Sequence, residues 1–397
     1  MRKLLSAPVK MGLSENENNI YQQALKHAAE ISLNLMAVKV ENRPEDFTNW
    51  CYELHHLCRD KLNYDLLEAE QLPTVKKLQQ TLEKGVSSSQ LKMLRITPWP
   101  FYVEYIKQNA VNTSLEERLK FLTYVNAIKA TPLHEMTELD RLTFAGKHTA
   151  NHDPGAYDFD NEWFASTRSA RVFHQLLEQR SSDFAQALSH IPLEGEVSYE
   201  QYTSFVTAYK DIFKTDADGQ PSDEKPQLLP ATRLLAMLRP DQFVTLSNQK
   251  MDLLCIALGC SKLNNLDFAG YWHEVIETIR TTAWYRQDAP EDAEELKLWQ
   301  ARVALIDLFF FADSNSPLES NYLKLKDRIA NGRSTSSKST GTSRKRTKET
   351  AEQIVDRRLE DPELPAYMKD RRDGLISEVE KGKSVDEVIN LFRAIFG

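Results

Sequence analysis

Residues 231–259 read ATRLLAMLRPDQFVTLSNQKMDLLCIALG, and the apolar residues on either side of a central turn predict two helices. Pro240 ends the first helix, because its ring removes a backbone donor and clashes with the preceding turn. Asp241 can begin the turn, and Phe243 can then fold back onto the apolar face of the helix. Gly259 suits the left-handed conformation that ends many helices. The segment therefore predicts a helix–turn–helix unit that buries one apolar face.

Helical periodicity extends over most of the chain. Ser14-x-x-Glu17 and Ser114-x-x-Glu117 are capping-box patterns, and each precedes apolar residues at three- or four-residue steps. The chain contains only 13 glycines in 397 residues, whereas sheet-rich and phosphate-loop proteins need glycine for turns and close backbone approach. We therefore predict an all-α, multi-helical protein, with two packed helical regions and a small tethered C-terminal helical module.

Shifts in composition divide the chain into four parts. The segment Gly85-Val-Ser-Ser-Ser89 predicts a loop and places a boundary near residue 95. Further along, residues 331–348 combine Ser, Thr and Gly with lysine and arginine and contain no acid, which is typical of a flexible linker. The predicted parts are an N-terminal helical region (1–95), a central helical domain (96–330), a flexible basic linker (331–349) and a C-terminal helical module (350–397).

The bulk composition limits the compartments and partners. No apolar run approaches the roughly 18 residues that span a bilayer, and the N-terminus lacks the sustained apolar core of a signal peptide. Four cysteines do not form a disulfide framework, so we expect a cytoplasmic protein without membrane contact. The net charge of −8 disfavours a non-specific nucleic-acid coat but allows a local basic patch.

The chemically densest segment is a polar loop between residues 145 and 161. Imidazoles and carboxylates can hold a divalent metal for phosphodiester hydrolysis. The candidate ligands are His148, His152, Asp153, Asp158 and Asp160. Their spacing matches no hydrolase motif, and Asp and Asn also favour loops because they hydrogen-bond nearby backbone. Two interpretations therefore stay open: a metal-dependent nuclease centre and an ordinary polar loop.

Other candidate motifs favour structural roles. Cys51, His55 and Cys58 would share one face of a helix, but zinc needs four ligands in a tighter arrangement, so we expect a half-buried helix face. The sequence contains neither a glycine-rich phosphate loop nor a GxSxG nucleophile elbow. We expect no cofactor, and the lack of a catalytic motif favours a protein that is not an enzyme.

Two groups of cations could contact DNA phosphates by releasing counterions. The cations of the basic linker are Arg344, Lys345, Arg346 and Lys348. An ordinary solvated linker would also explain this group. The cations of the helix–turn–helix unit are Arg233, Arg239 and Lys250.

The helix–turn–helix unit resembles an element of the helix-hairpin-helix DNA glycosylases. In that family an Asp shortly after the Phe is catalytic. This chain has Ser247 and Asn248 at the equivalent place, so the resemblance implies a DNA-binding module without glycosylase chemistry.

A broader set of segments resembles a family of bacterial helical proteins found in restriction and phage-defence gene neighbourhoods. The resemblance covers about residues 130–312. The segments are Trp163-Phe, Ile191-Pro-Leu, Ala231 to Met237, Arg239-Pro-Asp-x-Phe-Val, Tyr271-Trp to Trp284, Trp299 and Ala301-Arg-Val-Ala-Leu. It implies a non-catalytic component of a bacterial anti-phage defence or restriction system, which would bind a protein partner from a neighbouring gene and possibly DNA. The metal-dependent nuclease and the helical DNA-binding module are the alternatives.

Overall fold

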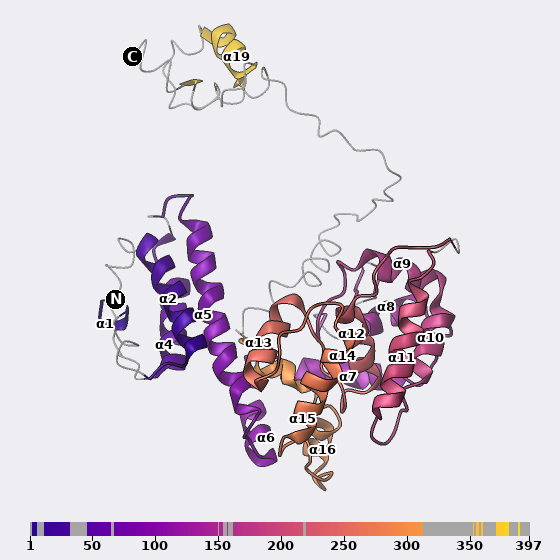
Figure 1. Cartoon of the computed structure of the whole chain (residues 1–397). Helices are drawn as coiled ribbons and strands as arrows, with labels where there is room; N and C mark the ends of the chain where they lie inside the picture. Colours follow the sequence, from indigo (N-terminus) through magenta and orange to yellow (C-terminus); the bar gives the residue numbers. More distant parts are fainter. Residues whose placement is uncertain are drawn as a thin grey trace. The chain divides into compact units, whose positions relative to one another are not determined.

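The computed structural model (Figure 1) divides the chain into two compact units, Met1–Thr335 and Ser336–Gly397. In the first unit it describes residues 2–5, 12–31, 46–64, 67–149, 151–153, 157, 162–216 and 220–312. In the second unit it describes residues 352, 355–356, 359, 371–380 and 388–389. The predicted boundary near residue 95 stays a prediction, and the predicted linker lies outside the described residues.

The described residues form an all-α, multi-helical fold, as predicted. They contain no β-strand, and one isolated antiparallel bridge joins Thr215 to Pro221. None of their helices is long and apolar enough to cross a membrane. The first helices are α1 (Arg2–Leu5), α2 (Glu15–Glu30), α4 (Phe47–His56), the π-helical η2 (Leu57–Lys61), α5 (Leu72–Met93), α6 (Trp99–Gln108), α7 (Leu115–Ile128) and α8 (Glu138–Ala145). They are followed by α9 (Arg171–Gln179), α10 (Ser181–Ser189), α11 (Tyr199–Ile212), α12 (Leu228–Leu238), α13 (Asn248–Leu258), α14 (Phe268–Gly270), the π-helical η4 (Tyr271–Ile276), α15 (Glu277–Thr281), α16 (Ala293–Trp299), the 3₁₀ helix η5 (Ala304–Phe309) and, in the second unit, α19 (Arg372–Glu380).

The helices α12 and α13 confirm the helix–turn–helix unit predicted from residues 231–259. Helix α12 ends before Pro240, and Phe243 is fully buried. The side chain of Ser247 accepts a hydrogen bond from the backbone N–H of Lys250 and so caps the start of α13. Gly259 ends α13 in the left-handed conformation, with φ of 73°.

The segment of residues 85–89, predicted as a loop, is instead part of α5. Gly85 lies where α4 approaches closely, because a Cβ atom there would meet Cys51 Sγ at 2.6 Å. The hydroxyls of Ser87 and Ser89 donate to the carbonyls four residues earlier at 2.8 and 3.2 Å, so they are satisfied within the helix. Glycine serves helix packing here rather than a turn.

Of the two predicted capping boxes, the first is confirmed and the second is wrong. Ser14 and Glu17 exchange side-chain and backbone hydrogen bonds at the start of α2. Ser114 instead has left-handed backbone angles, with φ of 52°, and its side chain makes no capping hydrogen bond. A capping hydroxyl reaches the first helical turn from an extended backbone, and Ser114 does not adopt one.

The described residues of the first unit form two hydrophobic cores, and α5 contributes to both. The N-terminal core packs α2, α4 and part of α5 around Trp50, whose Nε1 donates to the Leu4 carbonyl at 2.7 Å. Cys51 and Cys58 lie fully buried in this core. The larger core draws its side chains from residues 91–310 and surrounds α12.

Asp307 interrupts the most apolar stretch of the chain, residues 303–312, for a structural reason. It is buried and accepts charge-assisted hydrogen bonds from Arg118 and Lys250. Burial alone would raise the pKa of Asp307, but Lys250 and Arg118 hold it well below its usual range. Lys250 therefore serves a buried carboxylate, and the DNA contact expected of it stays a prediction.

Arg233 is fully buried in the larger core, where it binds backbone carbonyls. Its Nη2 and Nε each donate at 3.1 Å, to the carbonyls of Thr143 and Phe144 in the last turn of α8. Its Nη1 donates to the carbonyls of Trp163 and Phe164, and Phe164 has a left-handed φ of 63°. A side chain enclosed in this way cannot reach DNA, so the predicted phosphate contact of Arg233 is corrected.

The second unit contains α19 and a small hydrophobic cluster. Arg372 in α19 forms ion pairs with Asp356 at 2.5 Å and with Glu352 at 2.9 Å. The buried members of the cluster are Val355, Leu359, Leu375, Val388 and Ile389. The linker cations predicted to contact DNA lie outside the described residues; they are Arg344, Lys345, Arg346 and Lys348.

Gly146, which ends α8 beside Arg233, provides a test of this packing. Its φ is +86°, and a Cβ atom would lie 2.9 Å from the Ala165 carbonyl oxygen and 3.2 Å from Arg233 Nε. Gly146→Ala should lower the free energy of unfolding by about 3 kcal/mol, because overpacking adds to the cost of a left-handed alanine. Urea unfolding measures this loss.

Gly195→Ala is the matched control. Gly195 also has a positive φ, +72°, but a Cβ atom there would meet nothing within 4 Å. This variant should lose only about 1 kcal/mol, the cost of the left-handed backbone. Equal losses in the two variants would contradict a tightly packed contact between Gly146 and Arg233.

Candidate functional site

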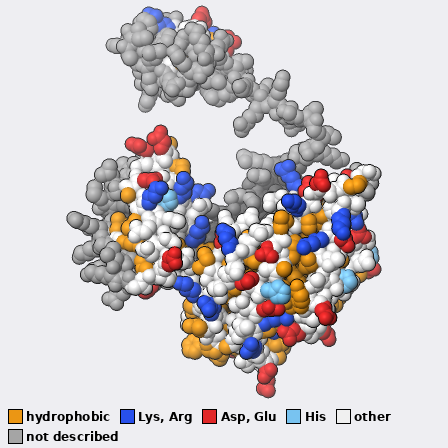
Figure 2. Space-filling model, in the orientation of Figure 1, with side chains coloured by type: hydrophobic (Ala, Val, Ile, Leu, Met, Phe, Trp, Pro, Cys, Tyr) orange, Lys and Arg blue, Asp and Glu red, His pale blue; other side chains and the backbone are white. Residues whose placement is uncertain are grey.

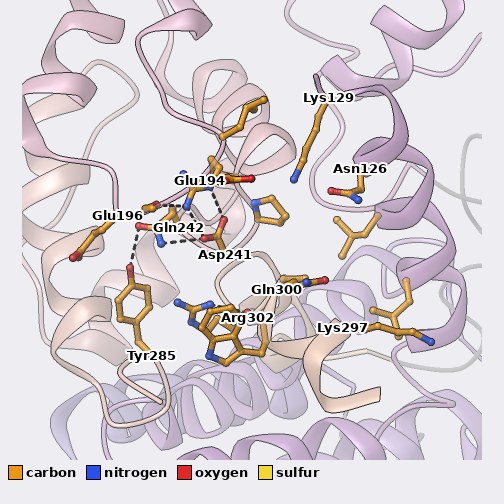
Figure 3. Close-up of a pocket in the computed structure, with 18 of the residues that line it drawn as sticks. Asn126, Lys129, Glu194, Glu196, Asp241, Gln242, Tyr285, Lys297, Gln300 and Arg302 are labelled. Carbon is orange, nitrogen blue, oxygen red and sulfur yellow. Dashed lines mark hydrogen bonds and ion pairs between the residues drawn. The ribbon is translucent and has the colours of Figure 1, made fainter. Parts of the chain in front are cut away.

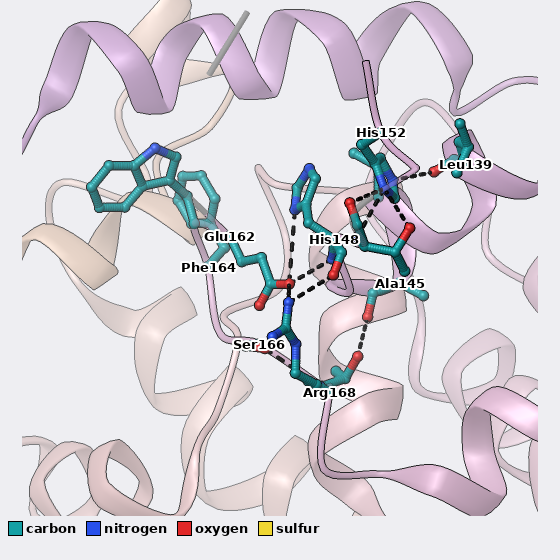
Figure 4. A network of polar contacts seen from close by, with 12 residues as sticks. Leu139, Ala145, His148, His152, Glu162, Phe164, Ser166 and Arg168 are labelled. Carbon is teal, nitrogen blue, oxygen red and sulfur yellow. Dashed lines mark hydrogen bonds and ion pairs between the residues drawn. The ribbon is translucent and has the colours of Figure 1, made fainter. Parts of the chain in front are cut away.

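The structure describes part of the predicted metal loop (Figure 4). His148 and His152 are buried with ring centroids 4.7 Å apart, whereas Asp153 is exposed. Asp158 and Asp160 lie outside the described residues. Within the described ranges, no group of three or more His, Cys, Asp or Glu side chains is placed to hold a metal ion. The described part of the loop therefore does not support a metal-dependent nuclease.

His152 is held by hydrogen bonds on both ring nitrogens (Figure 4). The backbone N–H of Thr149 donates to Nδ1 at 2.9 Å, so a neutral ring carries its proton on Nε2. Nε2 lies 3.1 Å from the Leu139 carbonyl, to which it donates, and 3.0 Å from the Thr143 hydroxyl. Burial lowers the pKa of His152, although the hydrogen bond from Nε2 to the Leu139 carbonyl opposes that change. These contacts give the ring a structural role between the loop and α8.

A second polar network joins the loop to the segment after it (Figure 4). Arg168 Nη2 donates to the His148 carbonyl at 2.7 Å and lies 3.3 Å from Glu162 Oε1. Glu162 also accepts from the backbone N–H of His148 at 2.5 Å. The charged side chains of this region thus bind backbone groups and one another.

His174 is a buried histidine whose protonation couples folding to pH. Its Nε2 lies 2.9 Å from the Thr167 hydroxyl. Burial and the nearby Lys147 lower the pKa of His174 to about 4, whereas the hydrogen bond to the Thr167 carbonyl raises it. An unfolded chain has a histidine pKa near 6.5, so the unfolded state binds more protons between these two values. This stabilising contribution is present above about pH 6.5 and is lost as the pH falls to about 4.

The variant His174→Gln should flatten the pH dependence of stability. The wild-type free energy of unfolding should fall by about 3 kcal/mol more than that of the variant between about pH 7 and pH 4. Urea unfolding across this range measures the difference. His134→Gln is the control, since the side chain of His134 is 45% exposed. A His174→Gln profile as steep as the wild type would contradict the assignment.

The first unit contains a cleft of about 960 Å³ where segments far apart in the sequence meet (Figure 3). Its lining includes the end of α7, residues 193–196, residues 239–242 of the helix–turn–helix unit, and residues 299–302. The charged side chains that line it are the cations Lys129, Arg239, Arg280, Arg286, Lys297 and Arg302 and the acids Glu194, Glu196 and Asp241. The cleft therefore has an excess of positive charge.

Arg239 shapes the cleft rather than presenting charge to it. Its Nε and Nη2 pair with the two carboxylate oxygens of Asp241 at 2.9 and 2.7 Å. Nη1 donates to the Pro192 carbonyl and Nη2 also donates to the Gly195 carbonyl. All three side-chain nitrogens are thus engaged and the residue is buried, which corrects the expectation that Arg239 contacts DNA.

Arg280 also binds side chains of the cleft lining. Its Nη1 pairs with Glu196 at 3.3 Å, and its Nη2 donates to the Gln242 side-chain oxygen at 3.0 Å. The Tyr285 hydroxyl donates to that same oxygen at 3.0 Å (Figure 3). The guanidinium lies over the Trp272 ring, 4.7 Å from its centroid. These contacts hold the Gln242 side chain and the tyrosine in fixed positions.

The other cations have fewer acidic partners within the described residues. Lys129 is half-buried, and burial lowers its pKa while Asp241 raises it. Arg286 and Lys297 are exposed, and Lys297 pairs with Glu294 at 2.7 Å. These lysines and arginines had no motif in the sequence to mark them. The one available signal was the resemblance to the bacterial helical family, whose matching segments include Arg239, Trp299 and Arg302.

Comparison with known protein families, with characterised proteins and with solved structures gives no match for this chain. The functional argument therefore depends on the chemistry of the cleft.

Proposed function

We propose that this protein is a non-catalytic component of a bacterial restriction or anti-phage defence system and that it binds DNA in the cleft. The observation that carries the proposal is the excess of cationic over acidic side chains in the cleft of a chain whose net charge is −8. The resemblance of residues 130–312 supplies the defence-system context. The cysteines are free thiols, which agrees with the cytoplasmic location that we propose.

The chemistry of the cleft suits a nucleic acid better than it suits a simple anion. Lysine and arginine bind phosphates, while aromatic rings can stack on bases. The half-exposed Trp299 lines the cleft together with the cations, whereas Tyr285 is a buried part of the lining. Over the face drawn in Figure 2, acidic and basic side chains of the described residues are interspersed. A local cleft therefore supports DNA binding more strongly than that mixed surface does.

The salt dependence of DNA binding tests this proposal. The affinity for single-stranded and duplex DNA should fall linearly with salt on logarithmic axes, because each phosphate contact releases counterions. The double variant Arg286→Gln/Lys297→Gln should reduce the magnitude of the slope by about 2, one for each lost contact. Fluorescence anisotropy between about 50 and 200 mM salt measures both slopes.

Lys214→Gln is the control for that experiment. The Lys214 side chain is 73% exposed and lies outside the residues that line the cleft. This variant should keep the wild-type slope. Absence of DNA binding, or a slope that the double variant leaves unchanged, would contradict DNA binding in the cleft.

We also propose that the second unit docks onto a protein partner from a neighbouring gene. The described part of this unit buries five hydrophobic side chains, and so small a core gains stability from a docked surface. The partner should co-purify with the full chain and should be lost when the chain ends at Thr335. A partner retained by the shortened chain would show that the contact lies in the first unit.

A further inference from the structure

We propose that the cleft holds one nucleotide, with its phosphate on Arg302, the rest of the ligand extending toward Lys129, and the ligand's hydrogen-bond donors on the acidic side chains of the lining. This inference rests on the proposed role of the cleft as a binding site, and it names the ligand unit and the two cations that recognise it. The two sources of such a unit are a free nucleotide and a nucleotide within a single strand.

Of the two cations, Arg302 gives the stronger evidence for an anion site. The residue is only 5% exposed, yet it lines the cleft. Among the described residues its one side-chain hydrogen bond runs from Nη1 to the Trp299 carbonyl at 2.7 Å, and its Nε is buried without a partner. Burial lowers its pKa, while Asp241 and two tyrosines raise it. A buried guanidinium with unused donors is costly unless an anion completes its bonding.

Two aromatic rings set the orientation of this guanidinium. Its central carbon lies 4.1 Å from the ring centroid of Trp299 and 4.8 Å from that of Tyr285. The tyrosine is fixed in turn by its hydrogen bond to Gln242. A planar fork held between two rings is pre-organised for a phosphate, and a lysine could not reproduce either the stacking or the fork.

Lys129 supplies the second cation from another wall of the cleft. It caps the C-terminal end of α7, and Figure 3 shows its side chain extending into the cleft apart from Arg302. It is half-buried, and no hydrogen bond or ion pair joins its ammonium to any other residue that the structure describes. Cations on separate walls can bind the two ends of one nucleotide, Arg302 the phosphate and Lys129 an oxygen acceptor of the base or sugar.

The remaining polar lining favours a nucleotide over a bare phosphate. The cleft, at about 960 Å³, is far larger than one phosphate and lies in the size range of small-molecule sites. Glu194 and Asp241 accept hydrogen bonds and repel a second anion, so they suit sugar hydroxyls and base amino groups. Asn126 and Gln300 add neutral donors and acceptors on the lining. A ligand with one anionic group and several neutral donors matches this set.

Isothermal titration calorimetry on the full chain tests the inference. The ligands are nucleoside monophosphates, inorganic phosphate, single-stranded DNA and duplex DNA. The variants are Arg302→Lys, which keeps the charge, Lys129→Gln, which alters a half-buried side chain, and the control Lys214→Gln. Thermal unfolding of each variant shows whether it folds. If Arg302→Lys does not fold, Lys129→Gln still tests the inference.

We expect nucleoside monophosphates to bind more tightly than inorganic phosphate, and Lys129→Gln and Arg302→Lys each to weaken that binding by about 10- to 100-fold. Nucleotide binding that both folded variants retain would overturn the inference, as would inorganic phosphate binding as tightly as the nucleotides. DNA binding that depends on Arg286 and Lys297 but not on Lys129 or Arg302 would overturn it and leave the proposed function standing. Nucleotide binding without any DNA binding would support it and refute the proposed function.

Discussion

The hydrogen bonding of the Arg239 guanidinium is the contact on which the cleft depends. One buried side chain pairs with Asp241, two residues further on, and also donates to the carbonyls of Pro192 and Gly195. It therefore joins the end of α12, the turn that follows and the segment that forms another part of the lining. A buried charge is tolerated only when its donors are satisfied, so the turn and the lining segment require one another.

The fold was predictable from the sequence where the physical cause is local. Pro240 and Gly259 each act on the backbone within one helical turn of themselves, and the structure confirms the unit that they delimit. The helical position of Gly85 was not predictable in this way. A residue without a side chain is needed there because Cys51 of another helix packs against it. The same residue type marks a turn in one place and a helix contact in another, and the difference lies in tertiary packing.

The candidate site shows the same division. The Arg-Pro-Asp-x-Phe motif lies on the cleft lining, but the roles of Arg239 and of the other arginines depend on partners that spacing does not reveal. Arg233 and Arg239 satisfy backbone carbonyls, whereas Arg302 keeps unused donors between two aromatic rings. Lys129 and Arg302 come from distant segments, so only the folded chain brings them to one cleft.

The central claim is that this cleft, in an otherwise acidic chain, binds the phosphate of a nucleotide. A crystal structure of the full chain with a bound single-stranded oligonucleotide tests it most directly. The account predicts a phosphate oxygen within about 3 Å of Arg302 Nη2 and another acceptor of the same nucleotide within about 3 Å of Lys129 Nζ. An oligonucleotide bound elsewhere on the protein, with no phosphate in the cleft, would contradict it.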